Sequence, residues 1–166
     1  MALALTPAWG ADEVANQLDT TYRAGELSVD AYGTAALGQY SLNHLSGDRV
    51  RRNTVLGGGL GVNYFFLQYL GAGIETDSQN GPGAFVSSAA GNVILRFPLG
   101  CCGLAPYVLG GGGYRFDEVK TSFGQAGGGV EFRFTPHWGL FADARAVLPT
   151  DTKSYGLARF GVRYAF

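Results

Sequence analysis

Charged residues are scarce in this chain, and lysine is almost absent. Asp, Glu, Lys and Arg make up 15% of the 166 residues, and only Lys120 and Lys153 are lysines. The formal net charge of −1 gives no general attraction to nucleic acid, so we expect no nucleic-acid partner. Hydrophobic residues at 46% and aromatic residues at 13% exclude an intrinsically disordered chain.

Long apolar runs are also missing. The sequence contains no stretch of about 18 or more apolar residues that could cross a bilayer as a helix. The nearest candidate, residues 59–74, is interrupted by Asn63, Gln68 and four glycines, which makes it a poor helix. Glycine accounts for 27 residues without a collagen-like period of three, so we expect it in tight turns and closely packed strands.

Strict alternation of apolar and polar residues is the dominant pattern, and it is clearest at the C-terminus. Residues 158–166 place Ala, Phe, Val, Tyr and Phe on one face and two arginines on the other. This period of two predicts a β-strand between two different environments. Similar segments recur along the chain and predict eight strands, at residues 26–36, 54–66, 69–77, 84–97, 105–116, 124–134, 138–148 and 156–166.

The connections between these segments alternate in character. Those after the first, third, fifth and seventh segments are polar, and the other three are short turns. Long loops on one side and short turns on the other are typical of outer-membrane barrels, whose long loops face outward. Tilted strands of about 9–11 residues suffice to cross a bilayer. We therefore predict an all-β fold, an eight-stranded antiparallel up-and-down transmembrane β-barrel of residues 25–166, in the bacterial outer membrane.

Two further segments are predicted to precede the barrel. Residues 1–10 are similar to the end of a secretory signal peptide, because the apolar Ala2–Leu5 leads to small residues at Ala8 and Gly10. The positively charged leader of such a peptide is missing, so the match is partial. Residues 11–24 are predicted to be an N-terminal periplasmic segment.

Charged residues at alternate strand positions predict which face of each strand points inward. The inward set holds six acids and six arginines: Glu26, Asp30, Glu75, Asp77, Glu131, Asp143, Arg96, Arg115, Arg133, Arg145, Arg159 and Arg163. A balanced set suits a narrow lumen, because guanidinium groups bind carboxylates through paired hydrogen bonds, whereas an unpaired buried charge is costly. A soluble lipid-binding barrel would show the opposite arrangement, so this inversion favours a membrane protein.

Aromatic residues are concentrated near the predicted strand ends. On the short-turn side the set is Tyr64, Phe66, Phe97, Phe132, Phe134, Trp138, Tyr164 and Phe166. On the loop side the set is Phe85, Tyr114, Phe116 and Tyr155. Two such girdles are typical of a barrel whose rings lie at both bilayer interfaces.

The segments ELSVDAYG, LGGGLGVNYFF, PYVLGGGGY and FGVRYAF resemble the OmpA-like and OmpX-like superfamily of eight-stranded outer-membrane barrels, which includes opacity-type surface proteins. The resemblance covers about residues 25–166 by the strand assignment above. It implies that Phe160, Val162, Tyr164 and Phe166 form the signal that the barrel-assembly machinery recognises. Outer-membrane lipid and lipopolysaccharide are then the expected surroundings.

The first polar loop contains a basic patch of Arg49, Arg51 and Arg52. On the predicted topology it faces outward, where it either contacts lipopolysaccharide phosphates or an acidic polymer, or is simply solvated. His44 lies in the same loop, and His137 lies in a short turn on the opposite side. Since the two histidines cannot share a site, we expect no catalytic residues.

The two cysteines, Cys101 and Cys102, are adjacent in a predicted short turn. A vicinal disulfide would be strained, and no histidine lies nearby to complete a zinc site. A vicinal disulfide, an intermolecular bridge and two reduced thiols are the alternatives. We expect neither a metal nor a cofactor.

The predicted function is that of a non-enzymatic barrel. Eight strands leave an interior just wide enough for side chains, so the lumen is expected to be plugged. Such a protein would serve envelope integrity or surface interaction, including adhesion, through its extracellular loops. A narrow ion-conducting channel and a soluble ligand-binding barrel are the alternatives. The sequence does not specify an extracellular partner.

Overall fold

The computed structural model describes residues 21–38, 40–42, 49–51, 54–79, 86–100, 102–116, 120–151 and 153–166. Residues 1–20, which include the signal-peptide prediction, lie outside the described part. The strands are β1 (Glu26–Leu37), β2 (Tyr40–Leu42), β3 (Arg49–Arg51), β4 (Thr54–Phe65), β5 (Leu70–Gln79), β6 (Ser88–Arg96), β7 (Leu104–Arg115), β8 (Thr121–Arg133), β9 (Trp138–Pro149) and β10 (Tyr155–Ala165). Within these residues no helix is long and apolar enough to cross a membrane.

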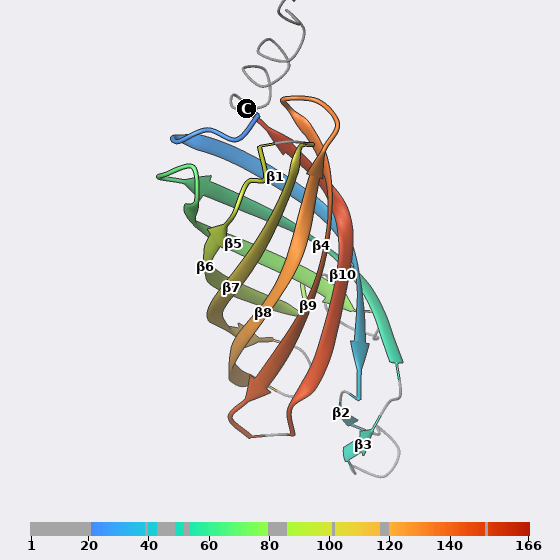
Figure 1. The fold of residues 1–166 in the computed structure, drawn as a ribbon. Helices are drawn as coiled ribbons and strands as arrows, with labels where there is room; N and C mark the ends of the chain where they lie inside the picture. The colour runs from blue at the N-terminus through green and yellow to red at the C-terminus, as the bar shows by residue number, and fades with distance from the viewer. Residues whose placement is uncertain are drawn as a thin grey trace, which may run out of the picture.

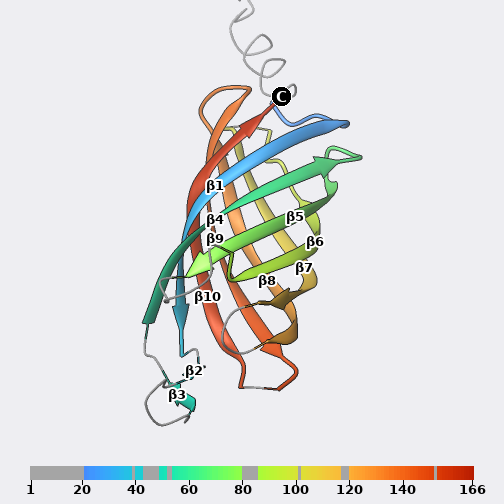
Figure 2. The ribbon, with the colours of Figure 1, turned by 180° about the vertical axis from the view of Figure 1, so that it is seen from behind.

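Eight of these strands close into a barrel (Figures 1 and 2), in the order β1-β10-β9-β8-β7-β6-β5-β4. Every neighbouring pair is antiparallel. The predicted eight-stranded up-and-down barrel is therefore confirmed. β2 and β3 form a separate two-stranded sheet in the first long connection. This small sheet was not predicted, because three residues per strand are too few to reveal a period of two.

The strand boundaries differ from the prediction by three or more residues in two places, and by one or two residues elsewhere. β8 begins at Thr121, three residues before the predicted start at 124, because Thr121 still pairs in register with Arg115 of β7. β6 begins at Ser88 rather than at residue 84, and Val86 and Ser87 precede it outside the strand. Thr121 and Ser122 are polar and carry no apolar alternation, so the prediction started the β8 segment too late, whereas the apolar residues 84–86 made it start the β6 segment too early.

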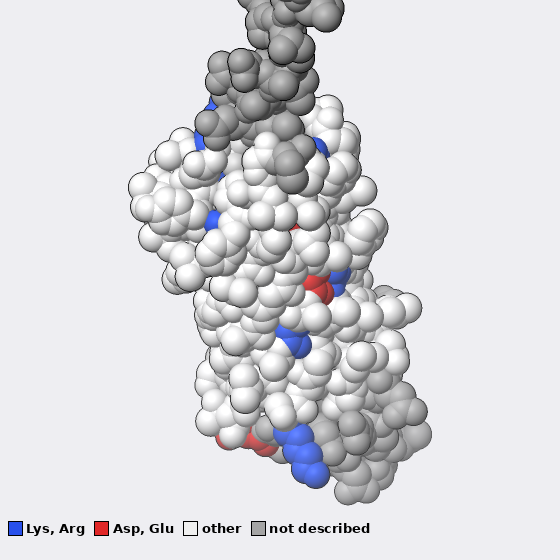
Figure 3. Space-filling model, in the orientation of Figure 1, with Lys and Arg blue, Asp and Glu red and all other residues white. Residues whose placement is uncertain are grey.

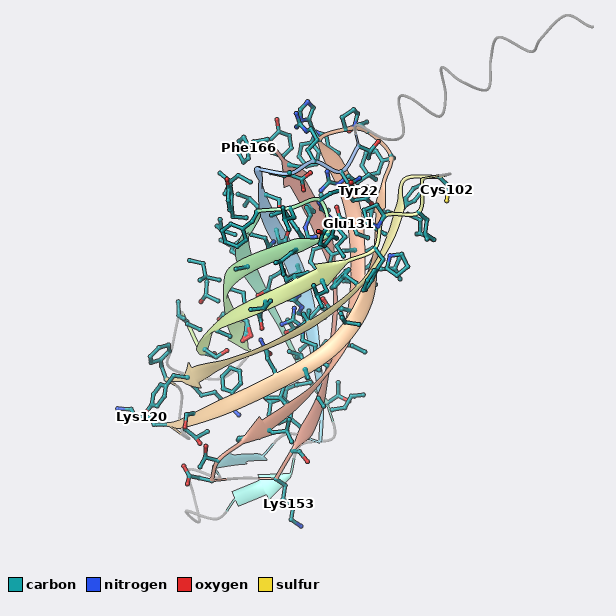
Figure 4. All side chains as sticks on the ribbon, turned by 60° about the vertical axis from the view of Figure 1, so that its left-hand side comes forward. Tyr22, Cys102, Lys120, Glu131, Lys153 and Phe166 are labelled. Atoms are coloured by element: carbon teal, nitrogen blue, oxygen red, sulfur yellow. The ribbon has the colours of Figure 1, made fainter. Side chains whose placement is uncertain are left out.

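The two ends of the barrel have different connections. Short segments join β4 to β5, β6 to β7 and β8 to β9 at one end, which we call the turn end. The start of β1 and the C-terminal Phe166 also lie there (Figures 1 and 4). The connections after β1, β5, β7 and β9 lie at the opposite end, the loop end, as the sequence predicted.

Pairing of β1 with β10 closes the barrel and fixes which residues face inward. The ladder runs from Ser28 opposite Ala165 to Leu37 opposite Gly156 and places Asp30 directly opposite Arg163. Because side chains alternate with period two, a slip of one residue would move every charge of a strand to the other face. The register is thus set by the charge pattern of the strands.

The wall is apolar on its outer face and polar on its inner face. Ile74 and Phe160 are 69% and 63% exposed, whereas Arg96 and Glu131 are fully buried. Figure 3 shows one side of this wall as mostly uncharged, with small patches of charged atoms and a charged lower end. A protein that folds in water normally shows the reverse distribution.

Two apolar groups also occupy the interior. One consists of Phe65, Ile94, Tyr107 and Leu109. The other consists of Ala36, Phe123, Val147 and Leu157, with Tyr155 packed against it. The placement of Tyr155 in an outer aromatic girdle was therefore wrong: it continues the inward row of β10, two residues before Leu157.

Glycines leave room for closely approaching groups inside the wall. A Cβ atom at Gly59 would lie 2.7 Å from the Tyr32 ring, and one at Gly111 would lie 2.0 Å from the carbonyl oxygen of Gly91. Only glycine fits at such distances. These glycines allow an eight-stranded wall to accommodate large aromatic and charged side chains in its lumen.

Candidate functional site: the charged barrel interior

The structure places all twelve predicted inward charges on the inner face of the wall. Ten of them are buried, and Glu75 and Asp77 on β5 are partly exposed. They form two groups of three acids and three arginines each. We call Glu26, Asp30, Glu131, Arg96, Arg133 and Arg163 the turn-end cluster, and Glu75, Asp77, Asp143, Arg115, Arg145 and Arg159 the loop-end cluster. Each cluster has no net charge.

Glu26 and Glu131 are the centre of the turn-end cluster, and Figure 4 shows Glu131 near this end of the barrel. Glu26 Oε1 lies 2.9 Å from Arg96 Nη1 and 2.6 Å from Arg133 Nη2. Glu131 Oε1 accepts a 2.6 Å hydrogen bond from Arg133 Nε. Strands β1, β6 and β8 are thereby joined across the lumen. Because both ends of each pair are charged, these hydrogen bonds are stronger than neutral ones.

Arg163 extends this cluster toward the middle of the barrel. Its Nη1 lies 2.5 Å from Glu131 Oε2, and its Nη2 lies 2.7 Å from Asp30 Oδ2. Asn63 donates a 2.9 Å hydrogen bond to the same Asp30 oxygen. Arg163 therefore connects β10 to both β8 and β1 through ion pairs.

The loop-end cluster is built around Asp143 and Glu75. Arg159 lies 2.7 Å from each of these carboxylates, and Arg145 lies 2.9 Å from Asp143 and 2.5 Å from Glu75. Two arginines and two carboxylates thus form a four-membered ring of ion pairs. At its edge, Ser88 donates a hydrogen bond to Asp77, and Arg115 is the register partner of Ser88.

Aromatic rings lie between and beside the two clusters. The guanidinium carbons of Arg159 and Arg163 lie 5.5 and 5.2 Å from the centre of the Phe141 ring. Tyr32 meets Phe141 edge to face and also carries Arg159 on its ring face, at 4.4 Å. Cation–π contact is favourable at these distances and strengthens when water is excluded. The rings thus add a second kind of favourable contact to arginines that are already paired with carboxylates.

Tyr22 covers the turn end of the barrel, and sequence reasoning missed it. Its ring lies 4.6 Å from the guanidinium of Arg96 and 4.4 Å from that of Arg133. Its hydroxyl donates a 2.8 Å hydrogen bond to the carbonyl of Gly103. Burial, with a contribution from Glu131, raises the pKa of this hydroxyl, so Tyr22 remains a donor even well above neutral pH. A residue before the first strand has no periodic signal that could reveal such a role.

The other side of Arg96 is also covered by an aromatic ring. The centre of the Phe65 ring lies 3.6 Å from its guanidinium carbon. Its Nη2 atom has no hydrogen-bond partner among the described residues. The two ring faces therefore take the place of a hydrogen bond for this fully buried arginine.

Several polar interior residues besides Tyr22 were not predicted. The Tyr107 hydroxyl donates a 2.7 Å hydrogen bond to Asp143, and Gln125 donates to Glu75 and to Asn92 at 2.8 and 2.7 Å. These residues occupy inward positions of the alternation, so the register could have identified them. A search for charges alone overlooks them because they carry none.

One small cavity lies beside the loop-end cluster among the described residues. A cavity of about 10 Å³, lined by Tyr32, Glu75, Gln125 and Arg159 among others, lies there. This volume holds about one water molecule. Within the described residues, no group of three or more His, Cys, Asp or Glu side chains is arranged to hold a metal.

The other predicted residues lie elsewhere. Phe160, Val162 and Phe166 are exposed, and Tyr164 is half-buried against Trp138 and Phe166.

Arg49 and Arg51 lie in β3, where the backbone alone is described, and Arg52 and His44 lie outside the described residues. His137 lies at the turn end, with Nδ1 2.8 Å from the Ala165 carbonyl. Cys102 is exposed at the turn end (Figure 4), and Cys101 lies outside the described residues.

Comparison with known proteins identifies the fold. No protein-family model and no curated protein matches the chain. The structure is similar to the N-terminal β-barrel domain of OprF from Pseudomonas aeruginosa, with a TM-score of 0.64 and 17% identity over 87% of this chain and 99% of that chain. It is also similar to the attachment invasion locus protein Ail of Yersinia pestis, with a TM-score of 0.57 and 16% identity over 86% and 99% of the two chains.

A third solved structure leads to the same conclusion. The outer membrane protein OprG of Pseudomonas aeruginosa matches with a TM-score of 0.55 and 12% identity, over 89% of this chain and 98% of that chain. The chain therefore has the fold of eight-stranded outer-membrane β-barrels. The resemblance inferred from the strand pattern is confirmed at the level of the fold.

The turn-end cluster makes a prediction about stability. Arg163→Met removes the shared partner of Asp30 and Glu131 and leaves two buried carboxylates short of positive charge. Breaking a buried pair in this way costs about 3–5 kcal/mol of unfolding free energy. Urea titration of the refolded protein, followed by tryptophan fluorescence, measures the loss. Lys153 is exposed, so Lys153→Met is the control and should change the free energy of unfolding by less than about 0.5 kcal/mol. Equal stability of Arg163→Met and wild type would show that the cluster does not hold the barrel together.

Proposed function

We propose that this protein is a non-enzymatic integral barrel of the bacterial outer membrane, with a lumen plugged by its own side chains. It would serve envelope integrity or surface interaction through the loops at its loop end. The observation that carries this proposal is the inverted wall, in which apolar side chains are exposed and ion pairs are buried.

The exposed apolar surface supports a location in lipid. Soluble monomers rarely expose contiguous apolar patches larger than a few hundred Å². Here large apolar residues are exposed on every strand of the barrel, from Leu27 on β1 to Val162 on β10. A closed barrel also satisfies its backbone hydrogen bonds internally, as a membrane interior requires.

The interior contacts support a plug rather than a pore. The guanidinium groups of the two clusters reach across the lumen to carboxylates on other strands, and Tyr22 covers the turn end. An ion could pass only if several of these pairs separated, and each separation leaves a buried charge without its partner. A channel is therefore the less favoured function.

The outward residues of β10 support the role that the resemblance gave them. We propose that Phe160, Val162, Tyr164 and Phe166 are recognised by the barrel-assembly machinery. Three of the four are exposed on the outer face, and Phe166 lies beside the last strand, where an assembly factor could reach it.

The loop end supports a role in binding anionic groups. β3 carries Arg49 and Arg51, and Arg52 follows it in the chain. Lys120 and Lys153 are exposed at the same end (Figure 4). Ail, which shares the fold, has been crystallised with the heparin analogue sucrose octasulfate. We propose that Arg49, Arg51 and Arg52 contact lipopolysaccharide phosphates.

Fractionation of producing cells tests the membrane location, and planar-bilayer recording of the purified protein tests the plug. We expect the protein in the outer-membrane fraction, with a heat-dependent shift on gels, and no steady unit conductance in planar bilayers. A protein that stays monomeric and folded in buffer without detergent would contradict the membrane location. Steady wild-type conductance would contradict the plug.

Binding to purified lipopolysaccharide tests the basic patch. Replacing Arg49, Arg51 and Arg52 with alanine removes about 1 kcal/mol of electrostatic attraction per residue, so the affinity should fall on the order of a hundredfold. The matched control replaces the same three residues with lysine, which keeps the charge and should largely keep the affinity. Unchanged binding of the alanine variant would rule out this contact.

A further inference from the structure

We propose that the cavity beside the loop-end cluster binds one monovalent alkali cation, sodium or potassium, with Asp77 as its charged ligand. Oxygen atoms of Glu75, Gln125, Ser88 and Tyr32 also line this cavity. The inference goes beyond the proposed function, and it does not depend on the outer-membrane location.

Asp77 differs from the other acids of the two clusters in its partners. The four-membered ring of ion pairs beside it is already neutral, because its two arginines are matched by Glu75 and Asp143. Arg115 makes contacts of its own. Within the described residues Asp77 forms no ion pair, and the hydroxyl of Ser88 is its hydrogen-bond donor. The cavity therefore faces one carboxylate that no directly bonded cation balances.

Gln125 directs a second oxygen into the same space. Its Nε2 donates to Glu75 and to Asn92 at 2.8 and 2.7 Å, and because both partners are acceptors, the orientation of the amide is fixed. Its Oε1 accepts no hydrogen bond from the described residues, yet this atom is not fully enclosed. Since Gln125 is only 5% exposed and lines the cavity, we infer that Oε1 faces the cavity.

The size and charge of the cavity favour a monovalent ion. Its volume of about 10 Å³ has room for one body the size of a water molecule. A magnesium ion would have to keep several water molecules, for which there is no room. A divalent ion would also leave excess positive charge beside Arg159, which lines the cavity too. One positive charge matches the one unbalanced carboxylate of Asp77.

The oxygen atoms come from four different strands. Tyr32 lies on β1, Glu75 and Asp77 on β5, Ser88 on β6 and Gln125 on β8. Carbonyl and carboxylate oxygens can replace the hydration shell of an alkali cation. Glu75 and Asp77 are partly exposed, so the ion can enter from the loop end. Because only the closed barrel brings these strands together, binding should stabilise the folded state.

Unfolding in different salts tests the site. The protein is titrated with urea at neutral pH in sodium, potassium or choline chloride of equal ionic strength, and choline is too large for the cavity. An ion that binds only the folded state lowers the equilibrium constant of unfolding by the factor 1 + [ion]/Kd, so about 0.3 M salt and a Kd of about 30 mM give about a tenfold decrease. The titration is made in detergent, or in buffer if the protein is soluble, so a wrong membrane location leaves this test intact.

Two variants separate ion binding from a structural role of the carboxylate. Asp77→Asn keeps the shape of the side chain and removes its charge. We expect this variant to unfold alike in all three salts, and in choline chloride to be at least as stable as wild type. The control, Asp151→Asn, removes one negative charge from the exposed loop end outside the cavity and should keep the tenfold effect. A gel shift on heating confirms that each variant is folded.

Sodium NMR of the folded wild type provides a readout that needs no variant. We expect the protein to broaden the sodium line, and added potassium chloride to reverse the broadening by competition.

The site is overturned if wild type unfolds alike in all three salts, which would assign the cavity to water. A cation effect that persists in Asp77→Asn would place the ion elsewhere and would also overturn it. Lower stability of Asp77→Asn than of wild type in choline chloride would give the carboxylate a structural role instead of an ion-binding one. An unbroadened sodium line would contradict the site independently of any variant.

Discussion

The pairing of charges inside a narrow closed barrel is the constraint on which the rest of this structure depends. Eight strands can close only around a small lumen, and their alternation sends every second side chain into it. Twelve of these inward side chains are charged. Such groups are tolerated away from water only when each finds a partner, so the strand register must bring opposite charges together.

The network meets this constraint in two neutral layers rather than in one. Three acids and three arginines near the turn end balance each other, and so do three of each nearer the loop end. Phe141 lies between Arg159 and Arg163, which belong to different layers, and it contacts both guanidinium groups. Because each layer has no net charge, neither layer exerts a strong long-range electric field on the charges of the other.

The turn end shows how segments outside the strands complete the interior. Tyr22 covers the guanidinium groups of Arg96 and Arg133, and the Thr21 carbonyl accepts a 2.6 Å hydrogen bond from Arg133. Arg23 donates a 2.9 Å hydrogen bond to the carbonyl of Phe166. The residues before β1 thus contact both the arginines in the lumen and the last residue of β10's segment, Phe166, and they cover the barrel at this end.

The fold could be predicted from the sequence because alternation and charge act on every strand. Arg159 and Arg163 on one face of the last strand were enough to define its inward side. The partners within the lumen could not be predicted, because they depend on the stagger between strands: Glu26 contacts Arg133 across 107 positions in the sequence. Tyr22 could not be found either, since it lies before the first strand. Tyr155 was misplaced because the predicted strand began at residue 156, so the inward alternation of Arg159 and Arg163 was not extended to it.

The central claim is that the outer face of the wall meets lipid. Ala144 is exposed in the middle of β9, among other small outward residues. Unfolding of Ala144→Arg from lipid vesicles, with Ser154→Arg beside β10 as the control outside the membrane, tests the claim directly. The account predicts that Ala144→Arg loses about 2–4 kcal/mol and that Ser154→Arg loses almost nothing. A change of less than about 0.5 kcal/mol for Ala144→Arg, as on a water-exposed surface, would contradict it.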